Sequence, residues 1–387
     1  MKILHLGNVP VPVGHPEKAR VKQHPGRWVL NHALAQKAAG MDVEIVTQAH
    51  KASRDFDCEI EGVTVHFLRT FHPWRHLTFY ALDAMRMAGA MRKIAPNIVH
   101  VHGTEAAYGH AALRAGLPFC VTAQGLFFQI IPTLGRAQTI SERALRIGED
   151  FVWKRTKHAV AKSEYVRDAL AAEYPHLDIS LIPNTYEPGL DGPLLYKPGS
   201  LVAYVGTLDE RKGVRYLAEA MKTVAAKVPD VELHVCGNAP EGAASGCEEE
   251  CIRLLRETLG PRLVLHGRIP SRDLFAVLDR CRALVAPSLE EMFGNQLIEG
   301  LMRGCRGIVT EGTALAENAR RFGNAATVPQ RDGAAIAAAL VETLSKPWDA
   351  AEAEAARANI RAYMSPETVS AKHAALYGKI LAKREKA

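Results

Sequence analysis

The sequence predicts an α/β protein made of two Rossmann-like domains, whose parallel sheets face each other across a cleft. Two observations lead to this prediction. Short apolar strand patterns alternate with helical patterns along the chain, and the alternation restarts after a cluster of Pro and Gly at 186–193. Strands separated by helices pair in parallel through right-handed crossovers, and Pro/Gly clusters mark linkers. We therefore expect an N-terminal domain over 1–190, a C-terminal domain over 191–365 and a last helix over 366–387.

Each expected strand is a short apolar or β-branched run, and helical patterns fill the intervals. The last helix should begin after an N-cap at Ser365, with Pro366 at its first position. The expected strands are 2–6, 43–47, 63–68, 98–102, 119–122 and 159–163 in the first half, then 201–205, 231–236, 263–266, 283–286 and 307–310.

The composition is that of a globular protein, with 48% apolar and 23% charged residues. No apolar run of about 18 residues predicts a spanning helix, and the polar N-terminus does not resemble a signal peptide. The net charge of +6 favours phosphate-bearing substrates or anionic lipid, and it is too small to indicate nucleic-acid binding. Seven cysteines without C-x-x-C spacing indicate free thiols, hence a cytoplasmic protein. We expect no metal site.

Two carboxylates, Glu291 and Glu299, stand eight positions apart around a Phe-Gly-Asn turn at 293–295. The run before them predicts a buried strand, and 296–303 predicts a helix. A helix N-terminus directs free N–H groups at an anion, and carboxylates accept hydrogen bonds from hydroxyls. A nucleotide-sugar, with a diphosphate between a sugar and a ribose, fits this pattern. The amides facing the phosphates would be those of Asn295, Gln296 and Leu297.

A second candidate segment opens the C-terminal half. The strand 201–205 runs into a loop with Gly206, two adjacent cations, Arg211 and Lys212, and another glycine at 213. These cations can neutralise a departing diphosphate. The alternative is a surface helix start, although cations there oppose the helix dipole.

These segments resemble the glycosyltransferases of the GT-B type, specifically family 4 (glycosyl transferases group 1), which retain anomeric configuration. Glu291-x7-Glu299, with Gly294 between, is similar to the E-x7-E signature of that family. Residues 206–213 are similar to its G-R-x-x-x-x-K-G motif, but Thr207 stands where an Arg is common. We hypothesise that Arg211 supplies the missing charge.

The resemblance also assigns roles to residues. Glu299 would bind the ribose hydroxyls and Glu291 the transferred sugar. The turn at 265–270 is similar to the loop that holds the donor base, here through Arg268 and Ile269, with Ser271 as the N-cap of the next helix. The family pattern further implies metal-independent front-face displacement without a protein nucleophile, and a last helix that crosses back to the first domain.

Acceptor-side candidates lie in the first half. A Pro-rich, basic loop over 9–25, with Gly14 and the adjacent Gly26, follows the first strand, where α/β sites form. It is either an acceptor clamp or an ordinary surface loop. Gln124 ends the fifth strand where relatives often have His; it can donate a hydrogen bond but cannot shuttle a proton. We place His100 in the core and leave His102 open between core and cleft.

The segment 71–80 mixes aromatic and basic residues and is followed by Arg92 and Lys93. It is either a contact with an anionic membrane surface or an ordinary packed helix. The expected localisation is therefore cytoplasmic, with peripheral membrane contact as an option.

Together these observations predict a retaining glycosyltransferase that moves a sugar from a UDP- or GDP-sugar to a hydroxyl of a sugar, glycolipid or small molecule. Cell-surface polysaccharide or glycolipid synthesis is a plausible setting. Alternatives are a GT-B sugar-nucleotide epimerase or hydrolase, or a non-catalytic nucleotide-sugar sensor. A nicotinamide enzyme is disfavoured, since no G-x-G-x-x-G follows the first strand.

Overall fold

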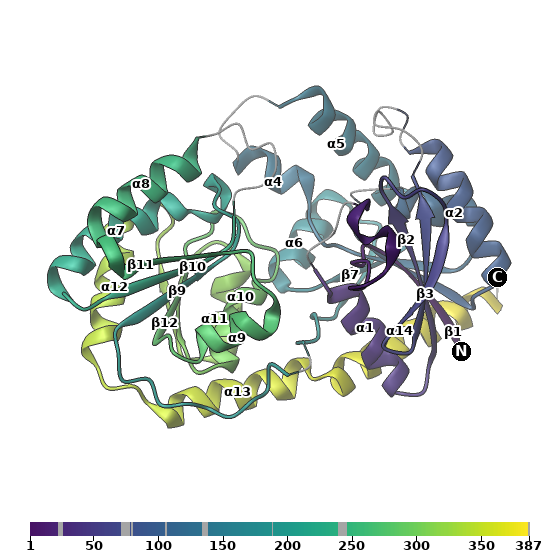
Figure 1. The fold of residues 1–387 in the computed structure, drawn as a ribbon. Helices are drawn as coiled ribbons and strands as arrows, with labels where there is room; N and C mark the ends of the chain where they lie inside the picture. Colours follow the sequence, from purple (N-terminus) through teal and green to yellow (C-terminus); the bar gives the residue numbers. More distant parts are fainter. Residues whose placement is uncertain are drawn as a thin grey trace. The chain divides into compact units, whose positions relative to one another are not determined.

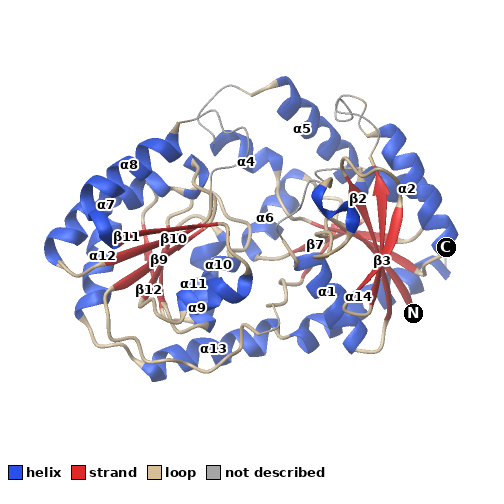
Figure 2. Cartoon of the chain, viewed as in Figure 1, coloured by secondary structure: helices blue, strands red, loops and turns tan. Residues whose placement is uncertain are grey.

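The computed structural model describes residues 1–21, 26–70, 78, 80–104, 107–133, 138–187, 189–238 and 246–385. The chain divides into two compact units, Met1–Thr185 with Met364–Ala387, and Tyr186–Tyr363. Each unit is a mostly parallel sheet with helices on both faces (Figures 1 and 2). Within the described residues, no helix combines the length and apolarity needed to span a bilayer.

The first unit has an eight-stranded sheet in the order β3-β4-β2-β1-β5-β6-β7-β8. All pairs are parallel except β3 with β4, which is antiparallel. The strands are β1 Lys2–Leu6, β2 Asp42–Ala49, β3 Phe56–Ile60, β4 Val63–Arg69, β5 Ile98–His102, β6 Phe119–Thr122, β7 His158–Ala161 and β8 Asp178–Leu181.

The helices of this unit are α1 Trp28–Ala38, α2 Ala81–Ile94, α3 Tyr108–Ala115, α4 Phe127–Thr133, α5 Ile140–Trp153, α6 Glu164–Glu173 and α14 Pro366–Glu385, with a 3-10 turn η1 Pro16–Ala19. The last helix packs against α1. It begins at Pro366, and the Ser365 hydroxyl accepts a hydrogen bond from the Thr368 amide at 3.2 Å. The predicted start of this helix is confirmed.

The second unit has a six-stranded parallel sheet in the order β11-β10-β9-β12-β13-β14. Its strands are β9 Leu201–Val205, β10 Glu232–Cys236, β11 Leu263–Gly267, β12 Ala283–Ala286, β13 Arg306–Thr310 and β14 Ala325–Val328. Its helices are α7 Val214–Lys227, α8 Cys247–Leu259, α9 Ser271–Leu278, α10 Asn295–Met302, α11 Ala314–Phe322, α12 Gly333–Ser345 and α13 Ala350–Met364, with 3-10 turns η2 Glu210–Lys212 and η3 Gly260–Arg262.

The predicted strands are present, but three further strands were not predicted. Each of these, β3, β8 and β14, lies at the edge of its sheet, and none is fully buried. Central strands such as β5 and β12 are covered on both faces and are buried along their whole length, which gives the continuous apolar run that sequence reading detects. Edge strands lack that signal because water reaches part of them.

Each sheet contains one point where the strand order reverses. In the first unit β1 lies between β2 and β5, and in the second unit β9 lies between β10 and β12. Open α/β sheets bind ligands outside the carboxyl ends of the strands at such a switch point. The candidate sites are therefore the loops that follow β1 and β5, and those that follow β9 and β12.

Candidate functional site

The loops after β9 and β12 contact each other at the switch point of the second sheet. The Leu289 amide donates to the Arg211 carbonyl at 2.7 Å, and Nη1 of Arg211 donates to the Glu290 carbonyl at 3.2 Å. Gly213 permits this approach, because a Cβ there would lie 1.9 Å from the Pro287 carbonyl oxygen. The two segments that the sequence marked as donor-binding are thus joined in one place.

The centre of this contact is an ion pair. Nζ of Lys212 donates to Oε2 of Glu291 at 2.5 Å, and Nε2 of Gln296 donates to the same oxygen at 2.9 Å. Both members of the pair are largely buried, with side-chain exposures of 13% and 14%. Burial acts to raise the pKa of Glu291, but the charges of Lys212 and Arg211 outweigh it and lower that pKa to about 2. Glu291 is therefore a carboxylate at neutral pH.

Thr207 does not take the place of a cation. Its Oγ1 donates to Oδ2 of Asp209 at 2.7 Å, while Oδ1 of Asp209 accepts the Lys212 amide at 2.8 Å. Thr207 and Asp209 thus shape the turn η2 that presents both cations. Gly206 lies close to the next loop, since a Cβ on Gly237 would meet the Gly206 carbonyl at 1.8 Å. Whether Arg211 replaces the family's missing charge stays a hypothesis.

The helix α10 begins one residue earlier than predicted, at Asn295, with Gly294 as its N-cap at φ +85°. A Cβ on Gly294 would lie 2.3 Å from the Leu315 side chain. Glycine is therefore required both for its positive φ and for the lack of space. One expectation is corrected. The Leu297 amide donates to the Gly294 carbonyl at 3.0 Å and therefore serves the helix rather than a phosphate.

The second carboxylate, Glu299, is in the opposite electrostatic situation to Glu291. Burial raises the pKa of Glu299 to about 8, the Glu187 carboxylate adds to the shift, and Lys212 opposes it. The pKa of Glu299 therefore lies on the opposite side of its ordinary value from that of Glu291, which favours the protonated acid. The two acids of the signature, which look equivalent in the sequence, thus have one lowered and one raised pKa.

The turn after β11 carries Arg268, which is exposed, and Ile269, which is half-buried. Ser271 is not the N-cap of α9. The helix begins at Ser271 with Pro270 as its N-cap, and the Ser271 hydroxyl donates to Glu187 at 2.8 Å instead. The N-cap prediction is wrong because the Ser271 hydroxyl binds the Glu187 carboxylate, a partner 84 positions away that the local sequence does not reveal.

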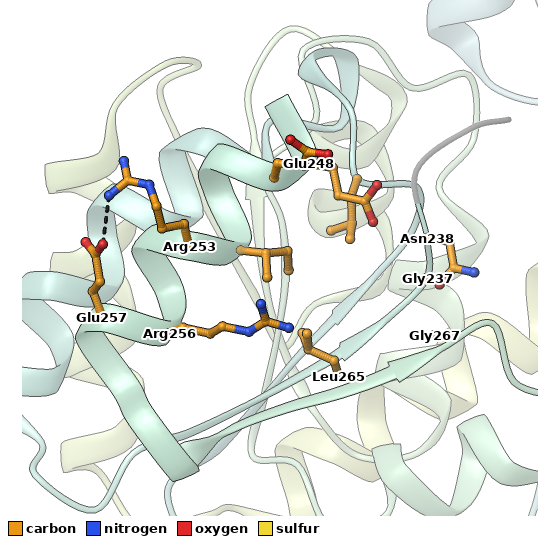
Figure 3. A pocket seen from close by; sticks show the side chains of 11 residues that line it. Gly237, Asn238, Glu248, Arg253, Arg256, Glu257, Leu265 and Gly267 are labelled. Atoms are coloured by element: carbon orange, nitrogen blue, oxygen red, sulfur yellow. Dashed lines mark hydrogen bonds and ion pairs between the residues drawn. The ribbon is translucent and has the colours of Figure 1, made fainter. Parts of the chain in front are cut away.

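A cavity of about 440 Å³ opens beside this turn, at the carboxyl ends of β10 and β11 (Figure 3). Asn238 and Gly267 line it from the strand ends, and α8 lines it from above. Arg256 reaches from α8 toward Leu265, while Arg253 is engaged by Glu257 at 2.7 Å. Its volume is within the range of small-molecule pockets.

In the first unit, the loop after β1 is described at residues 9–21, and the remainder to Pro25 lies outside the described residues. Gly14 has φ +85° in open space, and a Cβ on Gly26 would overlap the Trp28 ring. Glu17 ties this loop to the segment between β2 and β3, because its Oε2 accepts the Ser53 amide at 2.9 Å. Of the aromatic segment 71–80, only Thr78 and Tyr80 lie within the described residues.

The switch point of the first sheet brings three buried histidines together, which the sequence reading did not foresee. His5 comes from β1, and His100 and His102 come from β5; their ligand atoms lie within 4.8 Å of one another. Every ring nitrogen of the three has a hydrogen-bond partner in the protein, so we assign them no metal. His100 is in the core as predicted, and His102, 4% exposed, lies there too. Gln124 is half-buried beside them.

The seven cysteines are all free, as predicted. The Sγ atoms of Cys247 and Cys251 lie 3.8 Å apart on successive turns of α8.

Two family models match the chain, and each falls largely within one unit. Residues 25–189 match the model described as Glycosyltransferase Family 4, and residues 199–346 match Glycosyl transferases group 1. Sucrose-phosphate synthase from Thermosynechococcus elongatus is similar in structure, with a TM-score of 0.80, 20% identity and coverage of 99% of each chain. The chain is a GT-B glycosyltransferase of family 4.

Two further proteins are similar to this glycosyltransferase. Anabaena HepE, solved in complex with UDP and glucose, has a TM-score of 0.71 at 15% identity, covering 98% of this chain and 99% of that one. A 2-deoxystreptamine glucosyltransferase from Streptomyces kanamyceticus is 22% identical over 209 residues, 50% of this chain and 53% of that relative. The match thus spans about half the length of the curated relative, and at these identities the solved structures share the fold.

Proposed function

We propose that this glycosyltransferase transfers a sugar from a UDP-sugar to an acceptor hydroxyl with retention of anomeric configuration. The observation that carries the proposal is the largely buried Lys212–Glu291 pair at the switch point of the second sheet. There Lys212, Arg211 and the N-terminus of α10 would neutralise the diphosphate as it leaves the sugar. The choice of UDP over GDP is supported by HepE, whose complex contains UDP.

The protonation of Glu291 decides what it can do. A carboxylate with a pKa of about 2 is a poor general base at neutral pH, so Glu291 serves to orient the sugar hydroxyls. The acceptor proton would then pass to an oxygen of the departing phosphate. This is front-face displacement: the bond from the anomeric carbon to the phosphate oxygen breaks, and the bond to the acceptor oxygen forms on the same face. The reaction needs no metal in this scheme.

The donor nucleoside would lie over the carboxyl ends of β10 and β11. The cavity beside Gly267 is adjacent to Arg268 and Ile269, the residues expected at the base. Glu299, on the first turns of α10, would take the ribose hydroxyls. Its carboxylate accepts two hydrogen bonds, which the protonated form cannot do equally well.

The acceptor side would use the first unit, with Gly14 and Gly26 in the loop after β1 and Gln124 after β6. His102 would act through Gln124, since both of its ring nitrogens are already engaged. The acceptor would be a sugar, a glycolipid or a small molecule with a free hydroxyl.

We also propose that the first unit contacts an anionic membrane. A groove of about 580 Å³ has Leu113, Ile147 and Phe151 in its lining, with Arg114 and Arg155 beside them. Ile147 is 58% exposed, and the Arg155 guanidinium lies 3.8 Å over the Phe151 ring. Exposed apolar groups with adjacent cations suit the surface of an anionic bilayer. Ile147→Ser with Phe151→Ser should abolish cosedimentation with phosphatidylglycerol vesicles; unchanged cosedimentation would refute the contact.

The test of the reaction is nucleoside diphosphate release. The protein is incubated with UDP-, GDP- and ADP-sugars, with and without a fractionated cell extract as acceptor source, and Glu291→Gln serves as the inactive control. Release that depends on both a UDP-sugar and the extract supports transfer, and proton NMR of the glycoside product reports whether the anomer is retained. Release without any acceptor supports the hydrolase or epimerase. Binding of UDP-sugar without release under any condition supports the sensor.

A further inference from the structure

Eight side chains of the first unit form one continuous hydrogen-bonded chain. It begins at Lys162, directly after β7, and ends at Thr122, the last residue of β6; all its members except Gln124 are buried. The heavy-atom distances along it are Lys162 Nζ to Gln124 Oε1 2.8 Å, Gln124 Nε2 to His102 Nδ1 3.4 Å, His102 Nε2 to His5 Nδ1 2.7 Å, His5 Nε2 to Gln36 Oε1 3.0 Å, Gln36 Nε2 to Tyr377 OH 3.1 Å, Tyr377 OH to His100 Nδ1 2.6 Å, and His100 Nε2 to Thr122 Oγ1 2.6 Å.

The direction of every bond follows from the first one. A lysine ammonium can only donate, so the atom of Gln124 that faces Lys162 must be its oxygen, and its NH₂ must face His102. Nδ1 of His102 then accepts, which places the ring proton on Nε2, where it is donated to His5. The same step repeats at His5, whose Nε2 proton goes to the oxygen of Gln36.

The second half continues in the same sense. The NH₂ of Gln36 donates to the Tyr377 oxygen, the Tyr377 hydroxyl donates to Nδ1 of His100, and Nε2 of His100 donates to Thr122. Each histidine is neutral in this arrangement, in agreement with their burial, which lowers the pKa of His5 to about 4 and those of His100 and His102 well below the ordinary value. All three therefore carry the Nε2–H tautomer.

Without a donor-only group at position 162, the opposite polarity would be equally well bonded. Both glutamine amides could turn over, each histidine could move its proton to Nδ1, and each hydroxyl could donate the other way. The interior of the chain thus has two complete arrangements, and among its eight described members Lys162 is the donor-only group that favours one of them. A buried hydrogen-bond network with two possible donor-to-acceptor directions adopts the one that a fixed donor or acceptor at its end favours.

We propose that Lys162 is a positioning residue for the acceptor. It fixes the orientation of the Gln124 amide, because its ammonium sets the donor-to-acceptor direction of every hydrogen bond in the chain. The proposal deepens the proposed function, on which its acceptor role rests. Gln124 keeps one N–H and one oxygen lone pair beyond those used by His102 and Lys162. Turning the amide over exchanges them, so that an acceptor hydroxyl placed for the N–H would meet an oxygen instead.

The direct test is the tautomer of the histidines, read by long-range ¹H–¹⁵N NMR of the imidazole rings in the intact protein. Wild type should show His5, His100 and His102 as neutral Nε2–H rings at pH 7. Lys162→Met should introduce Nδ1–H signals, and Lys162→Arg, which retains a donor-only group, should restore the wild-type pattern. Lys157→Met, an exposed lysine before the opposite end of β7, is the matched control and should change nothing.

A second variant keeps the proposal testable if Lys162→Met does not fold. Gln124→Glu presents only acceptor oxygens to His102, so Nδ1 of His102 must then carry a proton and its neutral Nε2–H pattern should be lost. The Nδ1–H form, or a mixture, in wild type would overturn the proposal, as would unchanged tautomers in both variants.

The kinetic test separates this role from a merely structural one. With the active extract fraction titrated as acceptor, Lys162→Met should raise the half-saturating amount of that fraction (the apparent acceptor KM) about tenfold, the usual worth of one lost charge-oriented hydrogen bond. The KM for the UDP-sugar should stay unchanged, and Lys162→Arg should recover the wild-type value. An unchanged acceptor KM would refute the positioning role. Because the NMR pattern does not depend on catalysis, correct tautomers in a protein without transferase activity would refute the proposed function and leave the hydrogen-bond chain established.

Discussion

Nζ of Lys212 lies 2.5 Å from Oε2 of Glu291, although the two residues stand 79 positions apart in the chain. The contact joins the loop after β9 to the loop after β12, which are neighbours because the strand order reverses between these strands. The cation that we propose to stabilise the leaving diphosphate is thus held by the carboxylate that we propose to orient the sugar. Donor binding would therefore exchange part of this ion pair for contacts to phosphate and to sugar hydroxyls.

Loss of the cation should remove most catalysis. Lys212→Met is expected to lower turnover at least about a hundredfold, because a charge stabiliser of the leaving group is lost. The turnover of Glu291→Gln should be lower than that of wild type by a similar factor. Steady-state kinetics with saturating UDP-sugar measures both, and Arg215→Met, an exposed cation on α7, is the matched control. Turnover near wild type in the two site variants would remove them from the catalytic site.

The departure at Thr207 offers a rescue experiment. If Arg211 supplies the charge that family relatives carry after the glycine, Arg211→Met should lower turnover by about ten- to a hundredfold, the scale of one charge-assisted hydrogen bond. Adding Thr207→Arg to that variant should restore much of the loss. The Thr207→Arg single variant measures what loss of the hydrogen bond from Thr207 to Asp209 costs by itself. Failure of the double variant to recover relative to Arg211→Met would argue against the exchange of roles.

Gly213 should be intolerant of any side chain. It has φ +67°, and the Cβ of Gly213→Ala would lie 1.9 Å from the Pro287 carbonyl. Gly116 is the matched control: its backbone has almost the same angles, φ 68° and ψ 16°, but nothing lies within 4 Å of its missing Cβ. Gly116→Ala should cost about 1 kcal/mol of unfolding free energy for the left-handed backbone, and Gly213→Ala about 2 kcal/mol more for the clash. Urea unfolding measures both; equal costs would show that the loops need not touch.

The raised pKa of Glu299 predicts a pH dependence of donor binding. A carboxylate accepts both ribose hydroxyls better than a carboxylic acid does, so affinity for UDP-glucose should increase as the pH rises from 6 toward 8. Isothermal titration measures this, and the diphosphate of UDP-glucose has no titrating proton in that window. Glu299→Gln should bind more weakly at pH 8 and without the pH dependence. A flat profile in wild type would contradict this role of Glu299.

The same group affects stability. The folded pKa of about 8 lies above the ordinary 4.5, so between these values the folded state holds the extra proton and the free energy of unfolding decreases as pH rises. Glu187→Gln removes the neighbouring carboxylate that contributes to the shift and should move both the binding and the stability profile to lower pH. Identical profiles in Glu187→Gln and wild type would assign the shift to burial alone.

Much of the fold follows from local sequence. Apolar runs such as 98–102 and 283–286 are buried on both faces, and the Pro366 start of the last helix follows from capping chemistry. The edge strands β3, β8 and β14 were not predicted, because they are partly exposed to solvent and lack a continuous apolar run. Fixed spacings along the chain single out Gly206, Lys212 and Glu291, and the structure brings the two loops that carry them into contact. Their role in donor binding is the proposal made above.

The hydrogen-bonded chain from Lys162 to Thr122 could not be found in that way. His5, Gln36, His102 and Tyr377 come from four different elements, and only the pairing of β1 with β5 and the packing of α14 on α1 bring them together. Their polarity depends on Lys162, whose role is set by which atoms it faces. Likewise, the opposite pKa shifts of Glu291 and Glu299 depend on tertiary structure: burial, with Glu187 adding to it, raises the pKa of Glu299, and the charges of Lys212 and Arg211 lower that of Glu291.

The most direct test of the account is a crystal structure of the protein with UDP bound. We expect the diphosphate at the second-unit switch point, with Nζ of Lys212 and the Arg211 guanidinium within hydrogen-bonding distance of its oxygens and the ribose hydroxyls on Glu299. A diphosphate bound elsewhere, with both cations turned to water, would contradict it.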